Sequence, residues 1–101
     1  MSLACVVTAV YAESFYYNGH DYNVDENYGR SVESVHGISI GNKVNVRERP
    51  NTKARVITQL YKGDDVYVSR VYQGKAGDWY YVAWHSEATG WVLAKYIQIE
   101  R

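Results

Sequence analysis

The sequence predicts an all-β domain, a small and partly open barrel of about five or six short strands that follows an irregular N-terminal extension. From Gly37 onward, short apolar alternations are interrupted by Gly, Asp or Pro about every eight to twelve residues, which is typical of a small β-barrel or sandwich. β-Branched and aromatic residues dominate these alternations and favour strands. A chain of 101 residues has room for one compact core.

The first half of the expected barrel contains three strand segments. Residues 38–40 and 44–47 alternate apolar with polar side chains, which predicts one bent strand or two consecutive strands. Pro50 ends this segment because it has no backbone N–H to donate to a ladder. The β-rich stretch at 56–60 is the next expected strand, and the Gly and Asp residues of 62–65 predict a turn after it.

The second half repeats this pattern of strand and turn. Its apolar residues alternate or cluster in short β-rich runs, and glycines mark the breaks between them. The expected strands are 66–72, 79–84, 90–93 and 97–99, with turns at 73–78 and 86–89 and one 3₁₀ turn at 94–96. Closure of these strands into a barrel would protect most of their edges.

Residues 13–36 are expected to form an acidic, Tyr-rich coil. Four tyrosines are interleaved with polar residues, and neither a helical nor an alternating apolar period is evident. Residues 1–42 carry one basic and five acidic residues, a net charge of −4, whereas residues 43–101 carry +4. The extension could therefore lie against the barrel. The chain as a whole has no net charge and no basic run, which argues against nucleic acid as a partner.

The acidic spacing of Asp21–Asp25 resembles a calcium loop, but the pattern then fails. Glu26 stands where the sharp turn needs Gly, and Val32 stands where the last ligand should be Glu. His20 has no second His or Cys at ligand spacing. A solvated turn is the favoured interpretation, and the sequence predicts neither a metal site nor a cofactor.

Residues 1–12 are interpreted as a possible signal-peptide remnant. Leu3–Val10 is an apolar run, and the small residues of Ala9–Ala12 suit a signal peptidase, although no basic segment precedes the run. An ordinary strand at Ala4–Tyr11 and lipidation at Cys5 are the alternatives. The run is too short to cross a hydrocarbon layer of about 30 Å, so no transmembrane segment is expected.

The barrel sequence resembles the bacterial SH3 domain family. Val44–Arg47 followed by Pro50 is similar to the family's opening strand and loop, and Val56–Val68 is similar to its middle. The closing elements resemble Trp79–Val82, Thr89–Val92 and Tyr96–Ile97 of this sequence. The resemblance covers residues 37–99 and defines a barrel domain at 37–101. The sequence departs from the family at Glu48-Arg49, where a small Ser-Gly pair is usual.

The resemblance implies a non-enzymatic binding domain with a ligand groove. A barrel of this size cannot bury all its aromatic rings, and by the family's layout the groove borders the loop after Arg47. Flat rings would take apolar or sugar faces, and an arginine would hold a carboxylate. Trp91 could instead belong to the core. The candidate groove residues are Arg47, Arg49, Trp79, Tyr81, Trp91 and Tyr96.

No catalytic motif is visible, so the chain is expected not to be an enzyme, and a Cys5 nucleophile paired with His36 or His85 is disfavoured. The expected function is binding of peptidoglycan or its peptide stems by a secreted or periplasmic module of the bacterial cell envelope. The alternative is a periplasmic protein-binding module, such as an inhibitor, immunity or adaptor protein for an envelope enzyme. A third possibility is that residues 13–36 fold into the groove and block it.

Overall fold

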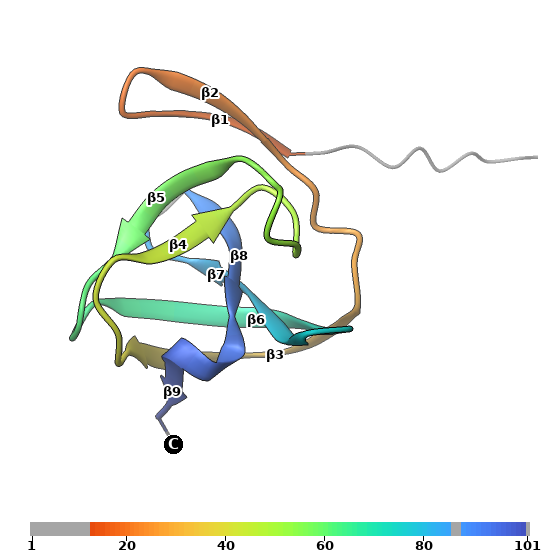
Figure 1. Cartoon of the computed structure of the whole chain (residues 1–101), viewed down its shortest axis with the longest axis vertical. Coiled ribbons are helices and arrows are strands. Elements are labelled where there is room, and N and C mark those ends of the chain that lie inside the picture. Colours follow the sequence, from red (N-terminus) through yellow and green to blue (C-terminus); the bar gives the residue numbers. More distant parts are fainter. Residues whose placement is uncertain (1–12, 86–87, 101) are drawn as a thin grey trace, which may run out of the picture.

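The computed structural model describes residues 13–85 and 88–100, and this part of the chain is nearly all β, as predicted. Figure 1 shows a curled sheet with a separate hairpin above it. The elements are β1 (Glu13–Tyr17), β2 (His20–Val24), β3 (Arg30–Ser39), β4 (Val44–Arg47), β5 (Val56–Leu60), β6 (Asp65–Gly74), β7 (Gly77–Ala83), β8 (Thr89–Leu93), a 3₁₀ turn η1 (Ala94–Tyr96) and β9 (Ile97–Ile99).

The barrel is one antiparallel seven-stranded sheet with the order β5-β4-β8-β7-β6-β3-β9. Register shifts in the β3–β6, β4–β5 and β6–β7 pairs are consistent with bulges, which let short strands bend and close. The expected strands at 44–47, 56–60 and 97–99 are confirmed with those bounds. The expected all-β barrel class is confirmed as well, although the sheet has seven strands where five or six were expected.

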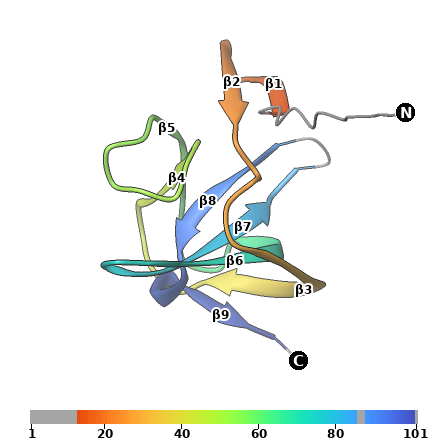
Figure 2. The same cartoon turned by 90° about the vertical axis from the view of Figure 1, so that its right-hand side faces the viewer.

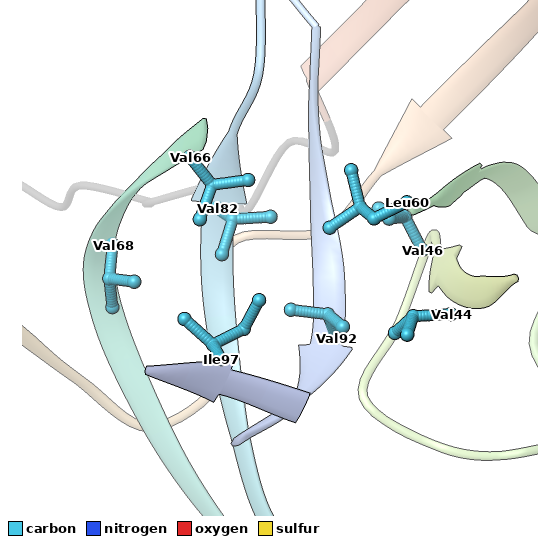
Figure 3. Packing of buried hydrophobic residues seen from close by; sticks show 8 residues of the cluster. All are labelled: Val44, Val46, Leu60, Val66, Val68, Val82, Val92 and Ile97. Atoms are coloured by element: carbon cyan, nitrogen blue, oxygen red, sulfur yellow. The ribbon is translucent and has the colours of Figure 1, made fainter. Parts of the chain in front are cut away.

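The barrel interior is an aliphatic core. Figure 3 shows the buried valines of this core, Leu60 and Ile97 pointing toward one another. The valines come from β4, β6, β7 and β8. Because side chains alternate along a strand, β4 and β6 each contribute two residues spaced two apart, and the other contributing strands supply one residue each. The buried cluster comprises Val44, Val46, Leu60, Val66, Val68, Val82, Val92 and Ile97.

The expectation of a coil in residues 13–36 is wrong at both ends of that segment. Residues 13–24 form the β1–β2 hairpin, in which Tyr17 pairs with His20 across an Asn18-Gly19 turn. Both turn residues have positive φ, 50° and 83°, which is the geometry that Asn-Gly favours. The alternation was obscured because aromatic rather than aliphatic residues occupy most of the positions that face the barrel.

The second correction concerns β3, which begins at Arg30 rather than near Gly37. It pairs with β6 along its length and with β9 at its end, so it is a strand of the barrel (Figure 2). Its first half exposes polar side chains, and the β3–β6 register shifts between Ser31 and Val35. A shifted register interrupts the period of two, which is why the sequence pattern did not reveal this part of the strand.

The expectations for residues 1–12 lie outside the described residues. Two residues of the expected turn at 86–89 do so as well. Within the described ranges, no helix has the length and apolar character that a membrane crossing needs.

Candidate ligand groove and the covered aromatic face

The strands β7 and β8 carry aromatic side chains on the outside of the barrel. Tyr81 and Trp91 are opposite each other across the β7–β8 ladder and therefore share a face, and their rings lie 5.2 Å apart. Val82 and Val92 belong to the interior cluster. The prediction that aromatic rings point out of the barrel is therefore correct for this pair.

The N-terminal extension covers these two rings. Trp91 is 0% exposed and Tyr81 is 5% exposed. The Tyr28 ring stands edge-on to the Trp91 ring at 6.2 Å, and the Trp91 Nε1–H donates a hydrogen bond of 2.7 Å to the carbonyl oxygen of Asp25. The second buried cluster of the protein joins this face to Tyr22 and other residues of the extension. Tyr81 and Trp91 are thus inaccessible to a ligand in this conformation.

Glu48 fastens the extension to the barrel. Its side chain is only 6% exposed, and its Oε2 accepts a hydrogen bond of 2.8 Å from the backbone N–H of Asn23. The backbone carbonyl of Glu48 accepts a second one, of 3.1 Å, from the N–H of Asp25. The resemblance noted in the sequence predicts a small residue at this position, and the carboxylate of Glu48 instead binds the hairpin.

Two arginines of the barrel complete the attachment. The Arg55 guanidinium lies 4.3 Å above the centre of the Tyr22 ring and donates a hydrogen bond to the carbonyl of Asp21. Arg70 donates to the carbonyls of Tyr28 and Gly29 at 2.9 and 3.0 Å. The extension does lie against the barrel, and these two arginines bind its backbone carbonyls rather than its carboxylates.

The open part of the predicted groove lies to one side of the covered face. Arg47, Trp79 and Tyr96 line one cavity of about 230 Å³ together with Lys43 and Thr52. Trp79 comes from β7, Arg47 ends β4 and Tyr96 ends the 3₁₀ turn, so the cavity joins segments that are distant in sequence. Trp79 is 4% exposed and forms part of the cavity floor.

A second cavity of about 290 Å³ continues past Trp79. It lies between the loop after β4, which contributes Pro50 and Thr52, and the β6–β7 hairpin, which contributes Tyr72 and Lys75. Trp79 and Thr52 line both cavities. The two hollows therefore form one groove across Trp79, which we call the Trp79 groove.

The described lining of the Trp79 groove is cationic. Lys43, Arg47 and Lys75 line it, and no Asp or Glu does. The Arg47 Nη1 donates a hydrogen bond of 2.9 Å to the carbonyl of Ala54, which holds the guanidinium in place and leaves its other N–H groups available. Lys95 Nζ lies 5.1 Å from the centre of the Tyr96 ring and adds positive charge beside the groove.

The structure therefore brings together three of the six predicted groove residues. Arg49 is half-buried and lines neither cavity, and Tyr81 and Trp91 lie under the extension. The loop that carries Pro50 was expected beside the groove, but Lys43, Thr52, Tyr72 and Lys75 were not predicted as lining residues. Their position in or beside turns was the available signal, because loops at the end of a barrel commonly build its binding site.

No group of three His, Cys, Asp or Glu side chains gathers to hold a metal ion within the described residues. In the segment whose acidic spacing resembles a calcium loop, the Asp25 carboxylate accepts hydrogen bonds from the backbone N–H and the side-chain amide of Asn27.

This seven-stranded antiparallel sheet, with no helix longer than one 3₁₀ turn among the described residues, is a small SH3-like all-β fold. The profile of the bacterial SH3 domain family matches residues 42–98, which is more than half of the chain. The chain belongs to the bacterial SH3 domain family, whose members are generally non-catalytic and often bind the cell wall. No curated protein and no solved structure gives a significant match.

Proposed function

We propose that this protein is a non-catalytic binding module of the bacterial cell envelope, periplasmic or secreted, that holds a peptide stem of peptidoglycan in the Trp79 groove. The observation that carries the proposal is that Arg47, Trp79 and Tyr96 line one cavity whose described lining has cations and no acid. Peptide stems bear free carboxylates, and a cationic groove with aromatic walls suits a carboxylate on a short peptide.

The chemistry divides between two kinds of side chain. Arg47 has a fork of N–H donors that can hold a carboxylate through two parallel hydrogen bonds, which gives both energy and direction. Tyr96 offers a flat, partly exposed surface on which an apolar side chain or a sugar face can lie, and Trp79, 4% exposed, supports the groove from beneath. Lys43 adds charge without a fixed geometry. No step of this binding needs a cofactor.

A sedimentation assay with purified peptidoglycan sacculi tests this proposal. Tyr96→Ala and Arg47→Gln should each weaken binding about tenfold or more, which corresponds to roughly 1.4 kcal/mol. Tyr67→Ala is the matched control, because Tyr67 is 57% exposed on β6 and does not line the groove. Melting temperatures of all variants should be measured in parallel.

Two results would contradict the proposal. Wild-type protein that sediments no more than albumin would exclude peptidoglycan, and a folded Tyr96→Ala variant with unchanged binding would exclude the groove. The alternative partner is an envelope protein, and the exposed tyrosines favour it, since Tyr is common at protein interfaces. Tyr16, Tyr61 and Tyr67 are all at least 47% exposed. In a pull-down from envelope extract, loss of a captured protein on Tyr67→Ala but not on Tyr96→Ala would support that alternative.

A further inference from the structure

A further cavity, separate from the Trp79 groove, lies between the hairpin and the barrel. Its charged lining is acidic, whereas that of the Trp79 groove is basic. Its volume is about 370 Å³, within the range of roughly 300–1,000 Å³ common for small-ligand sites. Tyr17 at the end of β1 forms one side. Asp64 and Asp65 at the start of β6, and Trp84 and His85 after β7, form the others. We call it the Tyr17 pocket.

Three rings meet at the Tyr17 pocket. The Tyr17 and Trp84 rings stand edge-on, with centres 5.7 Å apart and an angle of 84° between their planes. The His85 ring is also 5.7 Å from the Tyr17 ring, at an angle of 51°. Rings set at such angles present faces in different directions. Faces of Trp and Tyr attract a cation within about 6 Å through the ring quadrupole.

Two carboxylates supply negative charge beside these rings. Asp64 Oδ2 accepts a hydrogen bond of 2.7 Å from the N–H of Tyr61, and Asp65 Oδ1 lies 2.9 Å from Nε2 of His36. Each contact orients the carboxylate through one of its two oxygens. The described lining contains no Lys or Arg; the nearby histidines are His85, in the lining, and His36, which pairs with Asp65.

We propose that the Tyr17 pocket binds a primary alkylammonium group, such as the amine of a lysine-type side chain on a peptide. The ammonium carries three N–H donors, which suit the oxygens of Asp64 and Asp65, and its alkyl chain can lie along Trp84 and Tyr17. The Tyr17 pocket and the Trp79 groove share no lining residue. The Tyr17 pocket is therefore a separate site, and this proposal does not depend on the function proposed for the Trp79 groove.

Titration of the full chain, followed by ¹H–¹⁵N NMR, tests the pocket. The probe is Nα-acetyl-lysine methylamide, and the neutral control is Nα-acetyl-norleucine methylamide, which has nearly the same shape without the charge. The indole N–H of Trp84 is a buried reporter that has no acceptor among the described residues. The lysine compound should shift this resonance and the amides of Asp65 and His85, with an affinity at least about tenfold above that of the norleucine compound. Equal affinities, or no shift with either compound, would overturn the proposal.

Matched variants locate the binding. Asp65→Asn should reduce the affinity for the lysine compound about tenfold, whereas Asp78→Asn, an exposed change on β7, should leave it unchanged. Tyr17→Phe keeps the ring face and should bind like the wild type, whereas Tyr17→Leu should bind weakly. Tyr16→Leu is the control for the hairpin, since Tyr16 is 71% exposed. Unchanged affinity in Asp65→Asn, in a protein whose spectrum shows it folded, would refute the site even if Tyr17→Leu disturbed the hairpin.

Discussion

The indole N–H of Trp91 and the carbonyl oxygen of Asp25 are joined by a hydrogen bond of 2.7 Å across 66 positions of sequence. Trp91 sits on a central strand of the barrel, and Asp25 follows the hairpin directly. Most buried indole N–H groups have an acceptor, and for Trp91 the extension supplies it. The extension is therefore part of the folded domain, and it completes the packing of an aromatic face.

Trp91→Phe should destabilise the protein by about 2–4 kcal/mol, because it removes volume from a fully buried site and leaves the Asp25 carbonyl without its donor. Urea unfolding followed by circular dichroism measures the change. Sacculus binding by the folded fraction should be unaffected, because Trp91 lines neither cavity of the Trp79 groove. A Trp91→Phe variant of wild-type stability that no longer binds would show instead that Trp91 contacts the ligand.

Glu48→Ala should cost about 1–3 kcal/mol, since the N–H of Asn23 then loses its charged acceptor. The amide of Asn23 should also exchange faster with deuterium, as the hairpin loosens. Glu33→Ala is the control, because Glu33 is exposed on β3 and should change stability by less than about 0.5 kcal/mol. Equal effects in the two variants would mean that Glu48 does not hold the hairpin.

Gly29→Ala should be far more damaging than Gly19→Ala, although both glycines have positive φ, 66° and 83°. A Cβ at Gly29 would collide with the backbone carbonyl of Val71, whereas a Cβ at Gly19 would meet no atom within 4 Å. The Gly19 variant should lose only about 1 kcal/mol, from its backbone conformation. Thermal melts compare the two variants, and similar losses would show that the chain at Gly29 moves away from β6 easily.

Deletion of residues 1–24 should lower stability rather than raise ligand affinity. Burial of a large apolar side chain contributes roughly 1.5–3 kcal/mol, and the hairpin buries Tyr22 and Val24. The shortened protein should bind a hydrophobic dye and melt at a lower temperature. The idea that the extension blocks the groove predicts the reverse, a stable barrel with tighter sacculus binding.

The barrel was predictable because its valines alternate with polar residues in short runs, and turn residues separate the runs. The extension was not, because aromatic residues alternate with polar ones there and the Asn18-Gly19 turn joins strands that form no part of the barrel. The start of β3 was hidden for a different reason, the register shift after Ser31.

The site was only partly predictable, and the reason is non-local. Alternation shows that Tyr81 and Trp91 point out of the barrel, but it does not show whether another segment covers them. That depends on where the extension lies, which is fixed by distant contacts such as those of Glu48 and Arg55. Trp79 belongs to the same buried cluster as Tyr22 and Val24 of the extension, but together with Tyr96 it also lines the open groove.

The strands β7 and β8 are packed on both faces, by the aliphatic interior on one side and by the extension on the other. In β8 three consecutive residues, Gly90, Trp91 and Val92, are all buried. A sheet shielded in this way resembles the middle layer of a three-layer sandwich. The backbone amides of β7 and β8 should be the slowest of the described residues to exchange with deuterium. The amides of the edge strands β5 and β9 should exchange much faster.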